Sequence, residues 1–309
     1  MTAAAEPLLS VKDAGIEFGG LKALQQFNLE IRQGDLKGLI GPNGAGKTTA
    51  FNVLTGVYRP TSGEVRVSGQ VVNGKKPHQI NRLGLARTFQ NIRLFRELTA
   101  LDNVRVACLA ESRPPFSEER LARLRRSGGL GPFVAASLDA WNNYYDWWRA
   151  LLLTPGFLRE EEELTRRAEG LLEVMGLSHR RDEEARNLPY GEQRRLEIAR
   201  ALGTRPRVLL LDEPAAGMNT REKADLMVLI RRLREQFSLG ILVIEHDMKL
   251  VMGICEQITV LDHGDTIAVG TPEGVRSDRK VIEAYLGDSY LEAQKGAGAG
   301  AGAGQGAGP

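Results

Sequence analysis

The segment "GPNGAGKT", from Gly41 to Thr48, constrains the fold of this 309-residue chain more than any other part of the sequence. It matches the pattern G-x-x-x-x-G-K-[ST], follows the strand-like run "LKGLI" and opens a helix-like segment. Glycines at these positions let successive backbone N–H groups point at phosphate oxygens, and the helix N-terminus adds the positive end of its dipole. The segment therefore predicts a strand, a phosphate loop and a helix that together bind a nucleotide.

Several side chains in and near this loop have predicted roles in ATP binding. Lys47 is expected to reach the β- and γ-phosphates, and the Thr48 hydroxyl to ligate Mg²⁺. The aromatic ring of Phe18 is expected to stack on adenine, with simple core packing as the alternative. The predicted nucleotide-binding residues are Phe18, Gly41, Asn43, Gly44, Ala45, Gly46, Lys47, Thr48 and Thr49.

A second motif, "RVLLLDEP", supplies acidic residues that nucleotide hydrolysis needs. Its apolar strand ends in Asp212, which we expect to hold Mg²⁺ directly or through water. Glu213 follows at once and is positioned to polarise the attacking water as a general base. The alternative is that the two acids only cap a strand, and the phosphate loop upstream makes that the weaker interpretation.

Two further polar residues follow predicted strands. His246 comes after the apolar run "ILVIE", and in a parallel sheet the carboxyl end of this strand lies beside those of its neighbours. Its imidazole can then meet the γ-phosphate and the attacking water. Gln90 follows a short strand in "ARTFQNIRLF", where a neutral amide can meet Mg²⁺ or water. We predict Glu213, His246 and Gln90 as catalytic residues, and Thr48, Gln90 and Asp212 as metal ligands.

The order of the predicted elements indicates an α/β fold. Short alternating runs such as "FNLEI" and "GEVRVSGQVV" are typical of half-buried strands. In the second half of the chain, buried strands alternate with helices, which is typical of a parallel sheet. We therefore predict a P-loop NTPase (RecA-like) core with an antiparallel β subdomain and an inserted helical subdomain.

The chain is predicted to form one ATPase domain with a long insertion. Its parts are the domain at 8–291, the core at about 8–94 and 187–291, the helical subdomain at about 95–186, an extended insertion at 112–150, and a tail at 292–309. The 112–150 segment contains all three tryptophans. An aromatic stripe there is interpreted as packing on its own subdomain, with contact to a partner or membrane surface as the alternative. The glycine- and alanine-rich tail is predicted to be disordered.

Composition narrows the functional classes. Lysine plus arginine number 41 against 39 aspartate plus glutamate, so charge gives no argument for a nucleic-acid partner. Cys108 and Cys255 lack metal-ligand spacing, and a reducing compartment is expected. The N-terminus lacks a signal-peptide pattern, and no apolar run approaches the roughly 20 residues of a membrane span. If the protein serves a membrane, we expect it to act from outside the bilayer.

The stretch "LPYGEQRRLEIARAL", from Leu188 to Leu202, completes a set of motifs that resembles a known family. "GPNGAGKTT", Gln90, this stretch, "VLLLDEPAAGMN" and "IEHD" occur in the order and spacing of ATP-binding cassette (ABC) transporter ATPases. The resemblance covers about residues 8–288. It is closer still to the ATPase subunits of branched-chain amino acid importers, through "FGGLKAL", "ARTFQNIRLF", "EHDMKLVMGICEQITVLDHG" and "VIEAYLG".

The resemblance implies a mechanism and a set of partners. Two cassettes close head to tail, and each ATP, with its Mg²⁺, is held between the phosphate loop of one and the signature helix of the other. The signature residues expected to contact the opposite ATP are Leu188, Pro189, Tyr190, Gly191 and Glu192, with Asn219 in the D-loop. The implied partners are a second ABC ATPase subunit (a heterodimer in the transporter, a possible homodimer in isolation), two transmembrane permease subunits and, indirectly, a substrate-binding protein. The implied location is cytoplasmic, peripheral on the inner face of the plasma membrane.

Two signature residues depart from the family pattern, because Pro189 and Tyr190 stand where serine and glycine are expected. Pro189 suits the start of a helix beginning near Gly191, but the proline removes a hydroxyl and a backbone N–H. A hydrogen bond to a charged group contributes about 1.5–3 kcal/mol, and the Tyr190 hydroxyl is a candidate to recover part of this. Asn219, where many cassettes place an aspartate, is a second departure. We therefore predict asymmetry, with this chain's own site complete and the partner's nucleotide meeting a weaker half-site.

Two other functions stay open as alternatives. The same cassette can drive lipid or lipopolysaccharide export, since cassettes are reused. A non-transport ATPase acting on DNA or ribosomes is the second alternative. Such proteins usually need a long coiled coil or two fused cassettes, whereas this chain has one phosphate loop and no sustained heptads.

Overall fold

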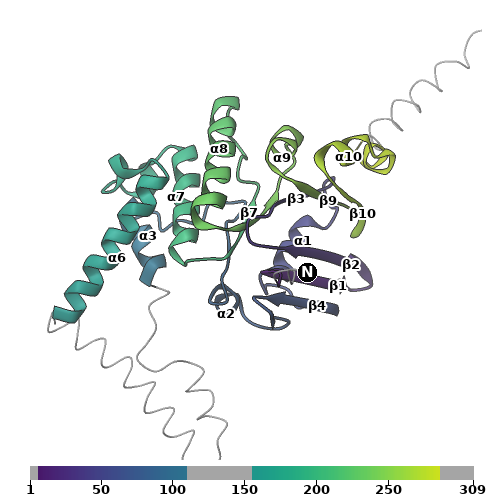
Figure 1. Cartoon of the computed structure of the whole chain (residues 1–309), viewed down its shortest axis with the longest axis horizontal. Coiled ribbons are helices and arrows are strands. Elements are labelled where there is room, and N and C mark those ends of the chain that lie inside the picture. The colour runs from purple at the N-terminus through teal and green to yellow at the C-terminus, as the bar shows by residue number, and fades with distance from the viewer. Residues whose placement is uncertain (1–5, 110–154, 286–309) are drawn as a thin grey trace, which may run out of the picture. The chain divides into compact units, whose positions relative to one another are not determined.

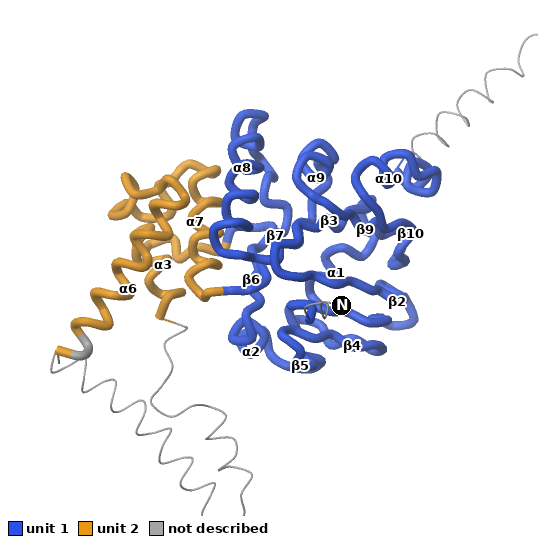
Figure 2. Tube along the Cα trace, viewed as in Figure 1, with its two compact units in different colours: residues 1–92, 206–309 blue, residues 93–205 orange. Residues whose placement is uncertain are grey.

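The structure, a computed structural model, describes residues 6–109 and 155–285. The predicted aromatic stripe within 112–150 and the predicted disordered tail at 292–309 lie outside the described residues. The chain divides into two compact units, residues 1–92 with 206–309 and residues 93–205 (Figure 2). The boundary falls after Arg205, so the helix that begins with the signature residues groups with the second unit.

A six-stranded sheet of order β10-β9-β3-β8-β7-β6 forms the centre of the first unit (Figure 1). Its strands are β3 (Leu36–Ile40), β6 (Leu85–Arg87), β7 (Val208–Asp212), β8 (Gly240–Ile244), β9 (Gln257–Asp262) and β10 (Asp265–Gly270). All neighbouring pairs are parallel except β9 with β10, which form an antiparallel hairpin. Every residue of β7 and β8 is buried, as expected for parallel strands covered on both faces.

The first unit also contains a four-stranded antiparallel sheet of order β2-β1-β4-β5. Its strands are β1 (Leu9–Phe18), β2 (Leu21–Ile31), β4 (Ser62–Val67) and β5 (Gln70–Val71). In β2, the alternate residues Phe27, Leu29 and Ile31 are buried, and so is Leu24, which lies beyond a register irregularity that breaks the strict period of two. These side chains join a hydrophobic core that includes Phe51 of the following helix and buried residues of the six-stranded sheet.

Several helices of the described residues accompany the sheets of the first unit. They are α1 (Lys47–Leu54), α2 (Pro77–Asn81), α8 (Thr220–Phe237), α9 (Met248–Ile254) and α10 (Pro272–Ser277). In α1, Ala50, Phe51, Val53 and Leu54 are buried, which fixes the helix that follows the phosphate loop against the core. The helices α8 and α9 begin at side-chain caps, Asn219 and Asp247, soon after the ends of β7 and β8.

The second unit is helical. It contains α3 (Ala100–Leu109), α6 (Pro155–Val174), two short 3-10 helices (Ser178–Arg180 and Ala185–Asn187) and α7 (Tyr190–Gly203). The helix α3 packs against both α6 and α7. A side chain at Gly203 would place its Cβ 2.8 Å from the Cβ of Ala107, so glycine permits the close approach of α7 to α3.

The predicted fold class is confirmed, with a parallel P-loop core, an antiparallel sheet and an inserted helical unit. The strands predicted in "FNLEI", "RVLLLDEP" and "ILVIE" are present. Among the described residues, none of the helices combines the length and apolar character that crossing a membrane requires.

Candidate functional site

The phosphate loop connects β3 to α1 and depends on close backbone approaches. Gly46 caps α1 in the left-handed region, with φ of 99°, and a Cβ there would lie 2.7 Å from the Ala23 carbonyl oxygen. A Cβ at Gly41 would lie 2.1 Å from the Leu261 carbonyl oxygen of β9. Both positions therefore exclude side chains, and the loop is held close to its neighbours by glycine alone.

Lys47 folds back over the loop that precedes it. Its Nζ donates to the carbonyl oxygens of Gly41 and Pro42, each at 2.8 Å, and the residue is 9% exposed. Burial lowers the pKa of Lys47, while the nearby carboxylates of Glu213 and Asp212 oppose that shift. The ammonium group is thus held at the mouth of the loop with carboxylates beside it.

The start of α1 offers backbone N–H groups to an anion. The first intrahelical hydrogen bond is donated by Ala50 to the Gly46 carbonyl at 2.8 Å, so the amides of Lys47, Thr48 and Thr49 precede the helical ladder. Of the other predicted loop residues, Asn43, Gly44 and Thr48 are exposed, Thr49 is half-buried and Ala45 is buried. The loop therefore presents amides and the Thr48 hydroxyl on an accessible side.

The two acidic residues at the end of β7 differ in burial and backbone geometry. Asp212 is 4% exposed and its Oδ2 accepts a hydrogen bond from Arg87 Nη2 at 2.6 Å. Glu213 lies in the left-handed region with φ of 47°, and its N–H donates to the Ile244 carbonyl at 2.9 Å. A non-glycine residue in this region stores backbone strain, which is characteristic of functional sites. The turn directs the two carboxylates differently although they are adjacent in sequence.

The structure brings the three predicted catalytic residues together. Gln90 Nε2 donates to Glu213 Oε2 at 3.0 Å, and His246 Nδ1 lies 3.8 Å from the same oxygen. The Glu213 side chain is 20% exposed and the His246 side chain 65% exposed, so both are accessible to a ligand. Three segments that are far apart in sequence thus meet at the carboxyl ends of parallel strands, where ligands bind in open α/β sheets.

Glu245 is a buried carboxylate in this cluster that the sequence analysis did not identify. It is 1% exposed and accepts hydrogen bonds from the amides of Ala215 at 2.8 Å and His246 at 3.2 Å. Burial raises the pKa of Glu245, and the charge of Glu213 adds to the shift. An acidic residue that ends the otherwise apolar strand "ILVIE" was the available signal, because a buried carboxylate needs specific partners.

Replacing Glu245 by glutamine is expected to remove a loss of folding stability that the wild-type chain shows as pH rises. Because the pKa of Glu245 in the folded state lies above the ordinary carboxyl value of 4.5, wild-type stability falls as pH rises from 4.5 through the folded-state pKa. Glutamine does not titrate. Urea unfolding of both proteins from about pH 4 to about pH 8 should therefore show the difference in unfolding free energy moving in favour of the variant as pH rises. A difference that is constant with pH would contradict the raised pKa.

Phe18 has an accessible ring with a second aromatic residue beside it. Phe18 is 45% exposed, and its ring centroid lies 5.2 Å from that of Tyr58, with the planes at 72°. Edge-to-face pairs of this kind fix ring orientation. The ring of Phe18 is therefore held at the surface rather than packed in the core, and its stacking on adenine stays a prediction.

The signature residues surround the start of α7 in the second unit. Leu188 is 3% exposed and extended, as expected before a proline, and Pro189 is the N-cap. The helix begins at Tyr190, one residue earlier than predicted. Glu192 is paired with Arg180, whose Nε lies 3.1 Å from its carboxylate, and Gly191 is partly accessible. The first hydrogen bond of the ladder is donated by Gln193 to the Pro189 carbonyl at 2.9 Å, so the amides before Gln193 precede the ladder at the helix start.

Tyr190 takes part in a network within α7. Its hydroxyl accepts a hydrogen bond from Arg194 Nη2 at 3.3 Å, and the Arg194 guanidinium lies 5.7 Å from the ring centroid. Arg194 is in turn 1% exposed and pairs with Glu197 at 3.0 Å. The hydroxyl that was a candidate contact for the opposite nucleotide is therefore already engaged as an acceptor by its own helix.

Asn219 has a local structural role in the first unit. Its Oδ1 accepts the Glu222 amide at 3.0 Å, and Glu222 Oε2 accepts the Asn219 amide at 2.9 Å. This capping box stabilises the start of α8. Asparagine and aspartate cap helices about equally well, so the cap alone does not explain why asparagine occupies this position.

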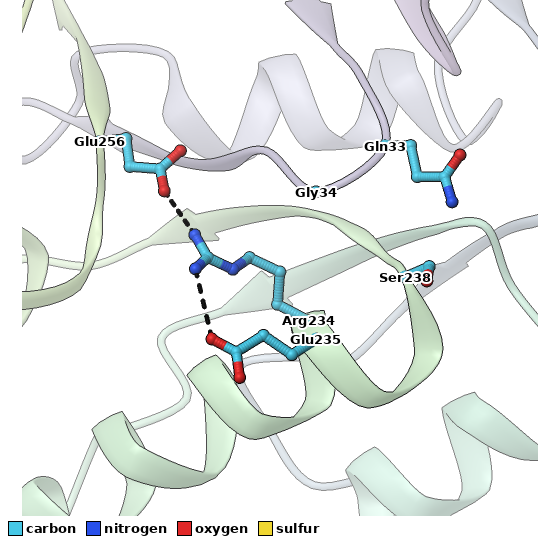
Figure 3. A pocket seen from close by; sticks show the side chains of 6 residues that line it. All are labelled: Gln33, Gly34, Arg234, Glu235, Ser238 and Glu256. Carbon is cyan, nitrogen blue, oxygen red and sulfur yellow. Dashed lines mark hydrogen bonds and ion pairs between the residues drawn. The ribbon is translucent and has the colours of Figure 1, made fainter.

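A hollow of about 310 Å³ lies at the opposite, amino ends of the parallel strands (Figure 3). It is lined by Gln33, Gly34, Arg234, Glu235, Ser238 and Glu256. Figure 3 shows the Arg234 guanidinium between the two carboxylates. Its nitrogens lie 2.5 Å from a Glu256 oxygen and 3.7 Å from a Glu235 oxygen. Its charge is already paired, and the hollow is on the wrong end of the sheet for the nucleotide.

Comparisons with known proteins agree with this geometry. The sequence model of the family described as "ABC transporter" matches residues 24–216, and that of "Branched-chain amino acid ATP-binding cassette transporter" matches residues 266–290. The chain is 44% identical to the high-affinity branched-chain amino acid transport ATP-binding protein LivG of Escherichia coli (strain K12), over 92% of this chain and 99% of that protein. It is 43% identical to the corresponding protein BraF of Pseudomonas aeruginosa, over 92% and 99%.

More distant similarities extend to another transport system and to solved structures. The lipopolysaccharide export system ATP-binding protein LptB of Haemophilus influenzae is 29% identical over 92% of this chain and 98% of that protein. A crystal structure of an ATP-binding cassette of an ABC transporter in its ADP conformation matches with a TM-score of 0.71 and 28% identity. That match covers 92% of this chain and 100% of the other.

Proposed function

Since the chain belongs to the ABC transporter ATPases, which hydrolyse ATP, we propose that it is the ATP-hydrolysing subunit of an importer for branched-chain amino acids. The observation that carries the substrate class is the 44% identity to LivG over 92% of the chain, together with the C-terminal family match at residues 266–290. Lipopolysaccharide export is the less favoured function, because the LptB similarity is 29%.

In this function, Glu213 is the general base that accepts a proton from the attacking water. Gln90 and His246 flank its carboxylate at 3.0 and 3.8 Å, so both can orient the water and contact the γ-phosphate. Lys47 and the amides at the start of α1 hold the phosphates. Phe18 stacks on the adenine ring.

The residues present fit Mg²⁺ as the metal. Among the residues that the structure describes, no three or more His, Cys, Asp or Glu side chains form a cluster for a metal ion, so a site built wholly from such side chains is not present there. Magnesium does not need one, as its ligands below show. Asp212 and the Thr48 hydroxyl supply hard oxygen donors, and Gln90 can add an amide oxygen. Magnesium typically takes one or two protein oxygens and completes its shell with water and substrate phosphates. When bound, the metal neutralises charge on the β- and γ-phosphates.

We place the chain in a transporter with a second ATPase subunit and two permease subunits, at the inner face of the plasma membrane. A substrate-binding protein delivers the amino acid, so this chain supplies energy and does not choose the cargo. Residues 8–291 act as one ATPase domain in this assembly. Leu188, Pro189, Tyr190, Gly191 and Glu192 meet the nucleotide of the second subunit.

The proposed substrate class is tested by genetic replacement. The chain is expressed in a bacterium that lacks its own LivG-type subunit and keeps the remaining importer genes, and uptake of labelled leucine is measured. Restored uptake supports the proposal, provided that the Lys47→Met variant does not restore it. Failure to restore uptake, combined with gene neighbours for lipid export rather than amino acid permeases, would favour the alternative function.

The double substitution Pro189→Ser with Tyr190→Gly is expected to raise ATP turnover at the second subunit's site. It restores a hydroxyl and a backbone N–H to the signature helix, and one hydrogen bond to a charged group is worth about 1.5–3 kcal/mol, roughly tenfold or more. The measurement uses the assembled transporter in a Glu213→Gln background, so that the remaining hydrolysis comes from the second site.

The variant Tyr190→Phe is the matched control for the signature test. It keeps the ring beside Arg194 and removes only the hydroxyl, which is engaged within α7. We expect it to leave turnover at the second site within about twofold of the parent, since it adds no new donor. Unchanged turnover and ATP affinity in the double variant would refute the predicted asymmetry.

A further inference from the structure

Arg87, at the end of β6, forms a buried ion pair with Asp212. The guanidinium Nη2 lies 2.6 Å from Asp212 Oδ2, and the two side chains are only 8% and 6% exposed. The backbone of Asp212 is held from the same segment, because its N–H donates to Thr88 Oγ1 at 3.2 Å. Strands β6 and β7 are also hydrogen-bonded neighbours. The carboxylate that the proposed function assigns to the metal is thus already paired with a protein cation.

Other groups hold the Arg87 guanidinium in place. Its Nη1 donates to Asn52 Oδ1 of α1 at 2.7 Å. The rings of Phe51 and Phe89 lie 5.3 and 5.2 Å from its central carbon. Arginine stacks well on aromatic faces and has a rigid set of donors. Because these contacts do not involve Asp212, the position of the guanidinium does not depend on Asp212 alone.

We propose that Arg87 is a positioning residue that holds the Asp212 carboxylate as an internal counter-cation and thereby raises the Mg²⁺ concentration needed for tight nucleotide binding. This inference rests on the proposed function, since it takes Asp212 as the metal-binding carboxylate. Two cations that share one carboxylate each reduce the benefit of the other. With Arg87 in place, the Asp212 carboxylate is oriented before the nucleotide binds. The free energy that Mg²⁺ gains by binding this carboxylate is then smaller.

Removal of the Arg87 charge has two consequences that separate this role from simple packing. Breaking a buried pair leaves an uncompensated charge, so the nucleotide-free chain is destabilised. The same uncompensated carboxylate attracts a divalent cation more strongly. A residue that only packed between two rings would show the first consequence without the second.

The test measures how strongly Mg²⁺ assists nucleotide binding to the purified full-length chain. The probe is the non-hydrolysable nucleotide AMP-PNP, and its dissociation constant is measured by calorimetry with EDTA and with excess Mg²⁺. The dissociation constant in EDTA divided by the dissociation constant in excess Mg²⁺ measures how strongly the metal assists nucleotide binding. We expect this ratio to rise about tenfold in Arg87→Met, within the range typical of coupled sites. In Arg87→Lys, which keeps the charge, it should stay within about threefold of wild type.

The Asp212→Asn background shows whether Arg87 acts through Asp212. There, Arg87→Met should leave the ratio unchanged, because the shared carboxylate is absent. This double variant leaves no unpaired charge, so it also serves where Arg87→Met alone does not fold. An equal rise in both backgrounds would overturn the proposal, and so would an unchanged ratio in a folded Arg87→Met protein.

A control arginine and the wild type complete the design. Arg66 pairs with Glu64 in the antiparallel sheet and is 43% exposed, so Arg66→Met should leave the ratio at its wild-type value. Wild-type chain that fails to bind AMP-PNP in either condition would refute the proposed nucleotide binding itself. Wild-type chain that binds it, with a ratio insensitive to Arg87, would refute only the role of Arg87.

Discussion

Replacing Glu213 by glutamine is expected to lower ATP hydrolysis at this chain's site by at least about 100-fold, the usual contribution of a positioned general base. Glutamine has nearly the same shape, so the residue still fits the left-handed turn and can still bond Gln90, but it cannot accept the proton of the attacking water. ATP binding should persist, because the phosphates are held by the loop and Lys47. Phosphate release by the assembled transporter and equilibrium ATP binding are the two measurements.

The control for this change is Glu235→Gln, near the end of α8 and away from the site, with a side chain that is 72% exposed. It should leave hydrolysis unchanged. Hydrolysis that survives in Glu213→Gln near the wild-type rate would show that the base lies elsewhere. Glu245, the buried carboxylate beside His246, would then be the next candidate.

The second large effect is expected from Lys47→Met, which keeps most of the length of the side chain and removes its charge. Lys47 is the cation that bonds the loop carbonyls of Gly41 and Pro42 and is poised for the phosphates. Loss of one charge-assisted hydrogen bond to a phosphate, at about 1.5–3 kcal/mol, should weaken ATP affinity roughly tenfold to 150-fold. Binding of a fluorescent ATP analogue to the purified chain measures this directly.

Lys37 provides a matched control for the lysine substitution. It lies on β3, the strand that leads into the phosphate loop, and its Nζ is 3.3 Å from Asp35 near the start of the strand. Lys37→Met should therefore leave ATP affinity within about twofold of wild type, as expected for a lysine in a partly exposed pair. Equal losses in the two variants would indicate general damage to β3 rather than lost phosphate contact.

The sequence predicted the sheets and the convergence of the site for identifiable physical reasons. The runs "VLLLD" and "ILVIE" are wholly apolar until their last residue, which is typical of parallel strands buried on both faces. Polar residues that follow such strands meet at one edge of the sheet. This explains why Gln90, Glu213 and His246 are neighbours in space, as predicted.

What the sequence could not show was the burial and pairing of single charged residues. Nothing in the segment "LARTFQ" distinguishes Arg87 from an arginine on the surface. Only the structure shows that it is buried against Asp212. The acidic residue at the end of "ILVIE" is visible in the sequence, but only the structure shows that Glu245 is buried. The pairing of the Tyr190 hydroxyl with Arg194 depends on side-chain geometry along one helical turn, which spacing alone does not determine.

The most direct test of the central claim is uptake of labelled leucine by proteoliposomes that contain the reconstituted transporter, with ATP supplied on the side of the ATPase subunits. The wild-type chain should support ATP-dependent uptake, and Glu213→Gln should reduce it to a small fraction while the complex remains assembled. ATP hydrolysis by the wild-type complex without uptake of any branched-chain amino acid, or full uptake with Glu213→Gln, would contradict the account.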